Sequence, residues 1–285
     1  MIASMFFFLF SQLGVGMMLT LLFLSPRRIG NGFFKFASLT AGILMGVTLG
    51  FNFIFPSLYR VGHGPEMLLL VSVVLTILYN RVVDLDKFSA AFALLVGAIV
   101  TGLVSIAWDS LAFTRLLNVA GWQHWMLAVN HFAATALLGS VLLTMVFGHW
   151  YLVIPKLSIE HLMKLTKVLM GAIILRMITV VATFVLIRME PELSLSAVLR
   201  VLMVQQGIFF WPRLLFGIVA PIVLAVMIHS TVQIRHTQAA TGLLYVAVVT
   251  LLFGEFFSKF LLFSVQLPFC FTFTVFFSDS RPMCP

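Results

Sequence analysis

The sequence predicts an all-α, polytopic membrane protein whose eight transmembrane helices form two parallel-repeated four-helix bundles. Three observations predict this fold. Of the 285 residues, 62% are hydrophobic and 9% are charged, which is more apolar surface than a soluble domain can bury. Apolar segments of the length needed to cross a bilayer, about 20 residues, recur along the chain. The second half of the chain also repeats the pattern of the first.

The apolar segments define the expected transmembrane helices. We expect them at about 3–24, 35–55, 66–82, 89–108, 125–150, 168–188, 208–232 and 240–264. The N-terminal sequence MIASMFFFLF has no basic region and no small-residue cleavage site, so we interpret it as the first span. Lys and Arg are more frequent in the connections that follow odd-numbered spans. The positive-inside rule therefore predicts a multi-pass protein of a bacterial cytoplasmic (inner) membrane with both termini on the outer side.

The second span carries small residues at a spacing that favours close helix packing. Gly42, Gly46 and Gly50 form a doubled GxxxG pattern, which lets a neighbouring helix approach. We expect this pattern to serve packing within the bundle, with a dimer interface as the alternative.

The connection 189–207 is long enough to hold a short helix. Pro191 and Ser194 can start it, and apolar residues follow at helical spacing, at Leu195, Val198, Leu199 and Leu202. This pattern predicts an amphipathic helix at the outer interface. A packed loop and a lid over an outward-facing site are the alternatives.

An internal repeat predicts how the spans are organised. The halves match at an offset of 129 residues, at Pro26/Pro155, Arg27/Lys156, Lys35/Lys164 and Gly42/Gly171. Further on the offset becomes 149, and segment 89–101 lies over 238–250. We expect a first bundle at 1–112, a second at 113–267 and an irregular tail at 268–285. Because each unit has four spans, both would share one orientation about an axis along the membrane normal.

Histidines in the second unit predict a haem site. His131 and His149 lie 18 residues apart in the fifth span, so their rings point the same way, roughly 27 Å apart. His149 and His229 fall near the inner ends of the fifth and seventh spans, where two imidazoles could ligate a low-spin haem b iron. In the repeat they replace Thr20 and Asn80. The alternative is that each histidine makes an interhelical hydrogen bond or lies at the interface.

For the outer histidine, His131, the candidate ligand partners are His63 and His124. Both lie in connections or at the ends of spans.

Charged residues in the last three spans predict a second site. Arg176, Arg213, Glu255 and Lys259 lie in apolar segments, where a charge needs a partner. One interpretation is a buried ion pair that sets helix register. The other is a quinone pocket in the outer half, in which Glu255 and His131 exchange protons with the quinol hydroxyls.

Other function classes find little support in the sequence. Cys270 and Cys284 form no Cys/His cluster, so a zinc or iron–sulfur site within this chain is not expected. The net charge of +8 is spread over many connections and does not form the basic stripe typical of nucleic-acid binding.

The segment 211–263 contains Gly254-Glu255 followed at i+4 by Lys259. It resembles the closing helices of the membrane-anchor subunits of molybdopterin oxidoreductases, of the DMSO-reductase and polysulfide-reductase type, which often have arginine at the lysine position. The resemblance implies a lipid-embedded anchor that exchanges electrons between quinone and peripheral iron–sulfur, molybdopterin or cytochrome subunits. Such anchors commonly lack haem, whereas the paired histidines resemble those of di-haem cytochrome b anchors.

The sequence thus predicts an integral membrane subunit of a respiratory electron-transfer complex, which is not catalytic alone. Its cofactors would be quinone and, at His149 and His229, haem b. Glu255 and His131 would take part in proton exchange, and the three cations Arg176, Arg213 and Lys259 would help to bind the cofactor. The alternatives are a small-solute or ion transporter and a non-catalytic membrane scaffold.

Overall fold

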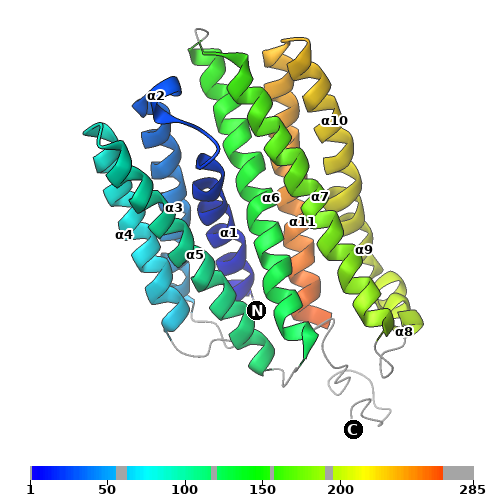
Figure 1. The fold of residues 1–285 in the computed structure, drawn as a ribbon. Helices are drawn as coiled ribbons and strands as arrows, with labels where there is room; N and C mark the ends of the chain where they lie inside the picture. Colours follow the sequence, from blue (N-terminus) through cyan, green and yellow to red (C-terminus); the bar gives the residue numbers. More distant parts are fainter. Residues whose placement is uncertain (1, 56–62, 117–120, 155–156, 190–194, 266–285) are drawn as a thin grey trace.

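The protein is all-helical in the part of the chain that the structure describes. The structure is a computed structural model and describes residues 2–55, 63–116, 121–154, 157–189 and 195–265. Every regular element in these ranges is a helix (Figure 1). Eight helical crossings are long and apolar enough to span a bilayer, which confirms the predicted all-α, multi-pass class.

Seven of the crossings are single helices, and one is segmented. The single helices are α1 (Ile2–Leu21), α3 (Asn31–Ile54), α4 (Gly64–Asp84), α5 (Phe88–Leu116), α6 (Trp122–Val153), α7 (Ile159–Met189) and α11 (Thr237–Val265). The segmented crossing joins α9 (Gly207–Leu214), the π-helical turn η2 (Leu215–Val219) and α10 (Ala220–Gln233). Three short elements connect them: α2 (Pro26–Ile29), α8 (Leu195–Arg200) and the π-helical turn η1 (Val201–Gln205).

The predicted spans coincide with these crossings, and two differences have clear causes. Helix α7 begins at Ile159 rather than near 168, because its first turns are amphipathic. Leu162 and Leu165 are fully buried there, while polar residues cover the other face. In the seventh crossing, Pro221 is the second residue after η2, which ends at Val219. The wider π-helical turn removes the clash between a proline ring and the carbonyl one turn earlier.

Two helices occupy the centre of the molecule. The spanning windows of α1 and α6 are 83% and 67% buried, compared with 28% for α4 and 22% for α7. Helix α1 packs against α3, α5 and α6, while α6 also packs against α7 and α11. The outer helices turn apolar side chains such as Ile43, Val71 and Ile178 away from the protein. These exposed apolar surfaces fit contact with a lipid bilayer.

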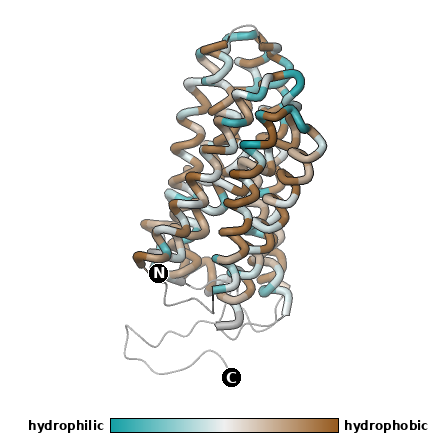
Figure 2. Tube along the Cα trace, turned by 90° about the vertical axis from the view of Figure 1, so that its left-hand side faces the viewer, coloured by the Kyte–Doolittle hydropathy of each residue, from teal (hydrophilic) through white to brown (hydrophobic). Residues whose placement is uncertain are grey.

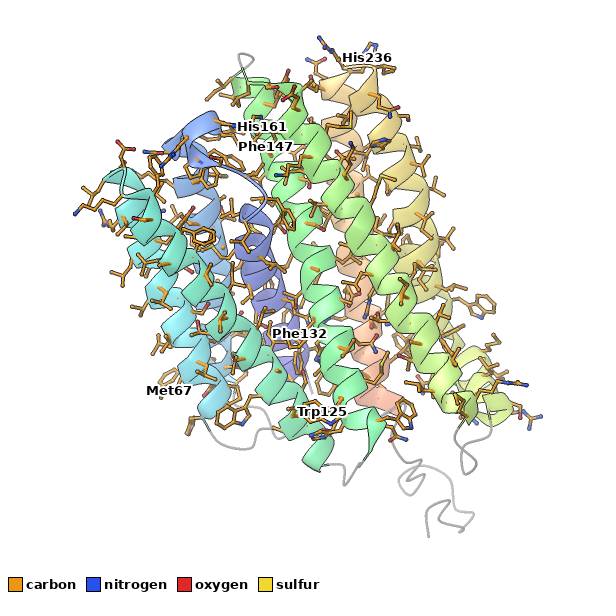
Figure 3. The ribbon with its side chains drawn as sticks, viewed as in Figure 1. Met67, Trp125, Phe132, Phe147, His161 and His236 are labelled. Atoms are coloured by element: carbon orange, nitrogen blue, oxygen red, sulfur yellow. The ribbon has the colours of Figure 1, made fainter. Side chains whose placement is uncertain are left out.

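The two ends of the molecule differ. We call the end at which α1 begins and α11 ends the terminal end (Figure 1). Figure 3 places Trp125 and Met67 at this end and His161 and His236 at the opposite end. Hydrophilic residues gather near the opposite end (Figure 2).

Glycines set the closest approach between the two central helices. A Cβ atom at Gly139 of α6 would overlap the backbone of Gly16 of α1. The doubled GxxxG pattern of α3 behaves differently, because a Cβ at Gly46 or Gly50 would meet nothing within 4 Å. The prediction that this pattern packs within the bundle was therefore wrong for these two glycines. The spacing identifies a face of the helix but not the direction in which that face points.

Gly139→Ala is expected to destabilise the fold by about 1–3 kcal/mol, because the new methyl group forces α1 and α6 apart. Thermal unfolding of the purified protein in detergent measures the loss. Gly50→Ala is the matched control and should be neutral or stabilising by a few tenths of a kcal/mol, roughly, since alanine favours a helix. Equal shifts for both variants would contradict the assigned packing role of Gly139.

The hairpins α4–α5 and α10–α11 match position by position at the offset of 149. In both, the turn contains a non-glycine residue with positive φ, 54° at Asp86 and 62° at Arg235. The preceding helices end at Asp84 and Gln233, and the following helices begin at Phe88 and Thr237. The same faces of α5 and α11 are buried, at Ala91/Ala240, Leu95/Leu244, Ala98/Ala247, Ile106/Glu255 and Ser110/Lys259.

The connection after α7 contains the predicted short helix. Helix α8 and turn η1 cover Leu195–Gln205, with Val198 and Leu202 buried. Pro191 and Ser194 lie outside the described residues, as does the tail 268–285. The predicted boundary at residue 112 falls within α5, which continues to Leu116.

Candidate functional site

A cavity of about 190 Å³ is lined by the first part of α6 and the last part of α11, and it therefore lies toward the terminal end. It is walled by α6, α7, α8, η1, α9, η2 and α11. Five residues singled out from the sequence line it together: His131, Arg176, Arg213, Glu255 and Lys259. Much of the remaining wall is apolar and includes Val180, Phe184, Leu202, Phe210, Ile218 and Leu262. The cavity therefore has a charged side and an apolar side.

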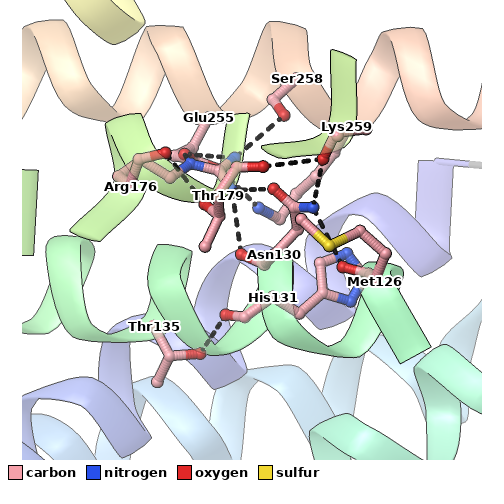
Figure 4. A network of polar contacts seen from close by, with 10 residues as sticks. Met126, Asn130, His131, Thr135, Arg176, Thr179, Glu255, Ser258 and Lys259 are labelled. Atoms are coloured by element: carbon pink, nitrogen blue, oxygen red, sulfur yellow. Dashed lines mark hydrogen bonds and ion pairs between the residues drawn. The ribbon is translucent and has the colours of Figure 1, made fainter. Parts of the chain in front are cut away.

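Glu255 and Arg176 form a two-pronged ion pair between α11 and α7 (Figure 4). Arg176 Nε donates to Glu255 Oε1 at 3.0 Å, and Nη2 donates to Oε2 at 3.2 Å. Both side chains are buried. Such paired, charge-assisted hydrogen bonds fix distance and orientation together. The sequence left three cations as candidate partners for Glu255, and the structure selects Arg176 and Lys259.

The remaining N–H groups of Arg176 also have partners. Nη1 donates to the backbone oxygen of Asn130 at 2.9 Å and to its Oδ1 at 3.1 Å, while Nη2 reaches Ser258 Oγ at 3.4 Å. Asn130 is held in turn by a 3.0 Å bond to Thr183 Oγ1. Sequence reasoning missed Asn130 and Ser258. The available signal was a polar side chain next to His131 and another one turn from Glu255, in otherwise apolar helices.

Lys259 completes the ion cluster. Its Nζ lies 3.1 Å from Glu255 Oε2, and its side chain is 2% exposed. The i, i+4 spacing on α11 brings the two groups to one face, as predicted. Just before them, a Cβ at Gly254 would overlap the backbone of Gly217. This glycine contact allows η2 to lie directly against α11, so that the seventh crossing closes the cavity beside Glu255.

The imidazole ring of His131 makes one hydrogen bond to the neighbouring helix α5. Its Nδ1 lies 2.6 Å from Ser110 Oγ on α5. Ser110 donates its hydroxyl hydrogen to the carbonyl of Ile106 at 2.6 Å, so we assign the Nδ1 hydrogen to His131 as donor to Ser110. In a neutral ring Nε2 is then a free acceptor. The ring of Phe8 lies 4.2 Å away, centroid to centroid.

Arg213 differs from the other cations of the cavity. Within the described part of the chain, it makes no hydrogen bond and no ion pair. The cavity wall thus carries three cationic side chains and, among its lining residues, a single carboxylate.

The predicted haem ligands lie apart from this cavity. His149 is exposed, with Nδ1 3.3 Å from Tyr245 Oη, and His229 Nε2 lies 3.0 Å from Gln233 Nε2 on its own helix. Their helices, α6 and α10, both pack against α7 and α11. The contact of His149 with Tyr245 joins α6 to α11 and so corresponds to the interhelical alternative that the sequence left open, whereas the contact of His229 stays within α10. The haem site stays a prediction from the sequence.

The other histidines considered as ligands have partners of their own. His63 Nδ1 lies 3.0 Å from Glu66, and His124 is hydrogen-bonded to Thr114. The structure therefore joins His131 to Ser110 and not to a second histidine.

The fold and the cavity define a class: a multi-pass membrane protein with a charged cavity among its apolar helices. Comparison with protein-family models, with curated proteins and with solved structures found no match to this chain.

Proposed function

We propose that this protein is the quinone-binding integral membrane subunit of a respiratory electron-transfer complex. The observation that carries the proposal is the two-sided cavity. A quinol has a small head with two oxygens and a long apolar tail, and the cavity offers polar groups on one side and an apolar wall on the other. Ligand pockets commonly combine an apolar lining with a few placed polar groups.

The polar groups suggest distinct roles around the quinol head. His131 Nε2 accepts the proton of one hydroxyl, with its Nδ1 held by Ser110. Arg213 and Lys259 donate to the other oxygen, where negative charge develops during proton and electron exchange. Both oxygens of Glu255 already accept hydrogen bonds from Arg176 or Lys259. Its role is therefore to position these cations, while His131 takes the proton of the hydroxyl that it faces.

The apolar wall offers a path for the tail. Phe184 on α7 and Phe210 and Leu214 on α9 line the cavity, and their neighbours Val185 and Leu215 are exposed on the surface of the molecule. We infer that the tail leaves between α7 and α9 toward lipid. Val198 and Leu202 of α8 and η1 line the same cavity, which is compatible with the lid considered from the sequence.

We also propose that the chain consists of two copies of a four-helix unit, α1 with α3–α5 and α6 with α7–α11. The matched hairpins support this, because equivalent turns share an uncommon positive φ. The first copy has buried Ile106 and Ser110 where the second has Glu255 and Lys259. One charged site per chain, in the second copy, is the consequence.

The terminal end is proposed to face outward from a bacterial cytoplasmic membrane. Basic residues are concentrated at the opposite end, at Arg27, Arg28, Lys35, Arg81, Lys87, Lys164, Lys167 and Arg235. This distribution supports the orientation by the positive-inside rule. The resemblance of segment 211–263 to the closing helices of molybdopterin-oxidoreductase anchors supports a peripheral iron–sulfur, molybdopterin or cytochrome partner.

Purified protein in detergent is expected to bind a short-chain ubiquinol or menaquinol saturably, measured by quenching of tryptophan fluorescence. Glu255→Gln should weaken binding, while Asp84→Asn, at an exposed pair far from the cavity, should leave it unchanged. The absence of saturable binding in the wild type would refute the quinone proposal. A visible spectrum of the same sample tests haem b, since a preparation without a Soret band removes that cofactor.

A further inference from the structure

The cavity carries more positive charge than its own residues balance. Arg176, Arg213 and Lys259 face a single carboxylate, Glu255, among the lining residues. Arg176 and Lys259 both bind this carboxylate, whereas Arg213 has no hydrogen-bond or ion-pair partner among the described residues. Charges within the membrane are costly unless they are paired. A bound anion would supply the missing partner.

The free donors identify the chemistry of that anion. Arg213 offers the planar N–H fork that matches carboxylate and phosphate oxygens. Lys259 Nζ has one hydrogen-bond partner among the described residues, Glu255 Oε2, so further N–H groups remain for a ligand. Arg176 has no comparable capacity, because its N–H groups already bind Glu255, Asn130 and Ser258. The ligand head is therefore an oxyanion placed between Arg213 and Lys259.

The position of Arg213 favours a lipid as the source of this oxyanion. Trp211 lies two residues earlier on α9 and is 53% exposed. Exposed tryptophans of membrane proteins gather at the depth of the headgroups, and two residues of helix rise by only about 3 Å. Anionic phospholipids are regular components of bilayers. The apolar wall beside Arg213, formed by Phe210, Leu214 and Ile218, could accommodate acyl chains.

We propose that Arg213 and Lys259 bind the phosphate of an anionic phospholipid, whose acyl chains lie along α7 and the α9–η2 segment. This inference goes beyond the quinone proposal and does not rest on it. The two ligands share the polar side of the cavity, so the lipid occupies it when quinol is absent and competes with quinol for Arg213. The two ligands can be distinguished by their charge, because quinol is neutral and the phospholipid is an anion.

The test uses the full-length protein, delipidated in detergent. Phosphatidylglycerol is titrated against phosphatidylcholine with the same acyl chains, and binding is followed by native mass spectrometry and thermal shift. Phosphatidylglycerol should bind more tightly and raise the melting temperature more. Arg213→Gln should weaken its binding about ten- to a hundredfold, the range expected for losing charge-assisted hydrogen bonds. Arg200→Gln is the matched control, because it removes an exposed cation of α8 that does not line the cavity.

Three outcomes would overturn the proposal. The first is that the wild type binds phosphatidylglycerol and phosphatidylcholine equally well. The second is that Arg213→Gln and Arg200→Gln have the same affinity for phosphatidylglycerol. The third is full stabilisation by inorganic phosphate alone, which would assign a free oxyanion site. If Arg213→Gln does not fold, Arg213→Lys replaces it. This variant should bind phosphatidylglycerol more weakly than the wild type does, but still more tightly than it binds phosphatidylcholine. Quinol binding is measured separately, so a failure of the quinone proposal leaves the lipid result interpretable.

Discussion

Glu255→Gln is expected to destabilise the folded protein by about 3–5 kcal/mol, the loss found when one partner of a buried ion pair is removed. The side chain keeps its shape but loses the charge that two cations share. Arg176 and Lys259 lie 2.9 and 3.1 Å from the Glu255 oxygens, and all three side chains are buried. After the substitution, Arg176 and Lys259 stay buried without a carboxylate between them. The amide NH₂ group of the new glutamine also faces an N–H donor at the position of a former acceptor oxygen.

Unfolding of purified wild type and variant in detergent, by heat or by SDS titration, measures this loss. Asp84→Asn is the matched control, because the Lys35–Asp84 pair has a similar N···O distance of 3.0 Å but side chains that are 40% and 59% exposed. An exposed pair contributes about 0–1 kcal/mol. Adding Lys259→Met to Glu255→Gln should restore part of the stability, since it removes one unpaired cation. Equal losses for Glu255→Gln and Asp84→Asn would contradict the structure of the cluster.

His131→Asn is expected to lower quinol-dependent electron transfer about 10²–10⁴-fold, the usual contribution of a general acid or base. The asparagine amide can still donate to Ser110 in place of Nδ1, which preserves the contact between α5 and α6. It has no counterpart of Nε2, the acceptor assigned to the quinol hydroxyl. The variant should therefore lose turnover while remaining folded, with only the modest loss of stability that follows from the empty space beside Phe8.

Turnover is measured in the complex assembled with its partner subunits, with a short-chain quinol as donor. His124→Asn is the control, because His124 is hydrogen-bonded to Thr114 on the same pair of helices and does not line the cavity. Ser110→Ala should lower turnover by an intermediate amount. His131 Nε2 remains in this variant, but Ser110 no longer fixes the tautomer of the imidazole ring. Wild-type turnover in His131→Asn would remove the proton-exchange role.

Sequence alone determined the all-helical class and the positions of the eight crossings. Hydrocarbon satisfies no backbone hydrogen bonds, so an apolar run of about 20 residues in a lipid-embedded chain can only be a helix. The identity of the charged residues followed from the same reasoning, because Arg176, Glu255 and Lys259 stand out in apolar segments. Their need for partners was predictable as well. The i, i+4 contact of Glu255 with Lys259 required no tertiary information.

Tertiary structure alone decided which distant groups meet. Arg176 and Glu255 are 79 residues apart, and Ser110 on α5 reaches His131 on α6, 21 residues further along the chain. Such pairings depend on how each helix is rotated about its axis and how closely it approaches its neighbours. Close approach at Gly16/Gly139 and Gly217/Gly254 sets these rotations, whereas Gly46 and Gly50, with the better sequence motif, face open space. A spacing pattern defines one face of a helix, and only packing against the other helices determines where that face points.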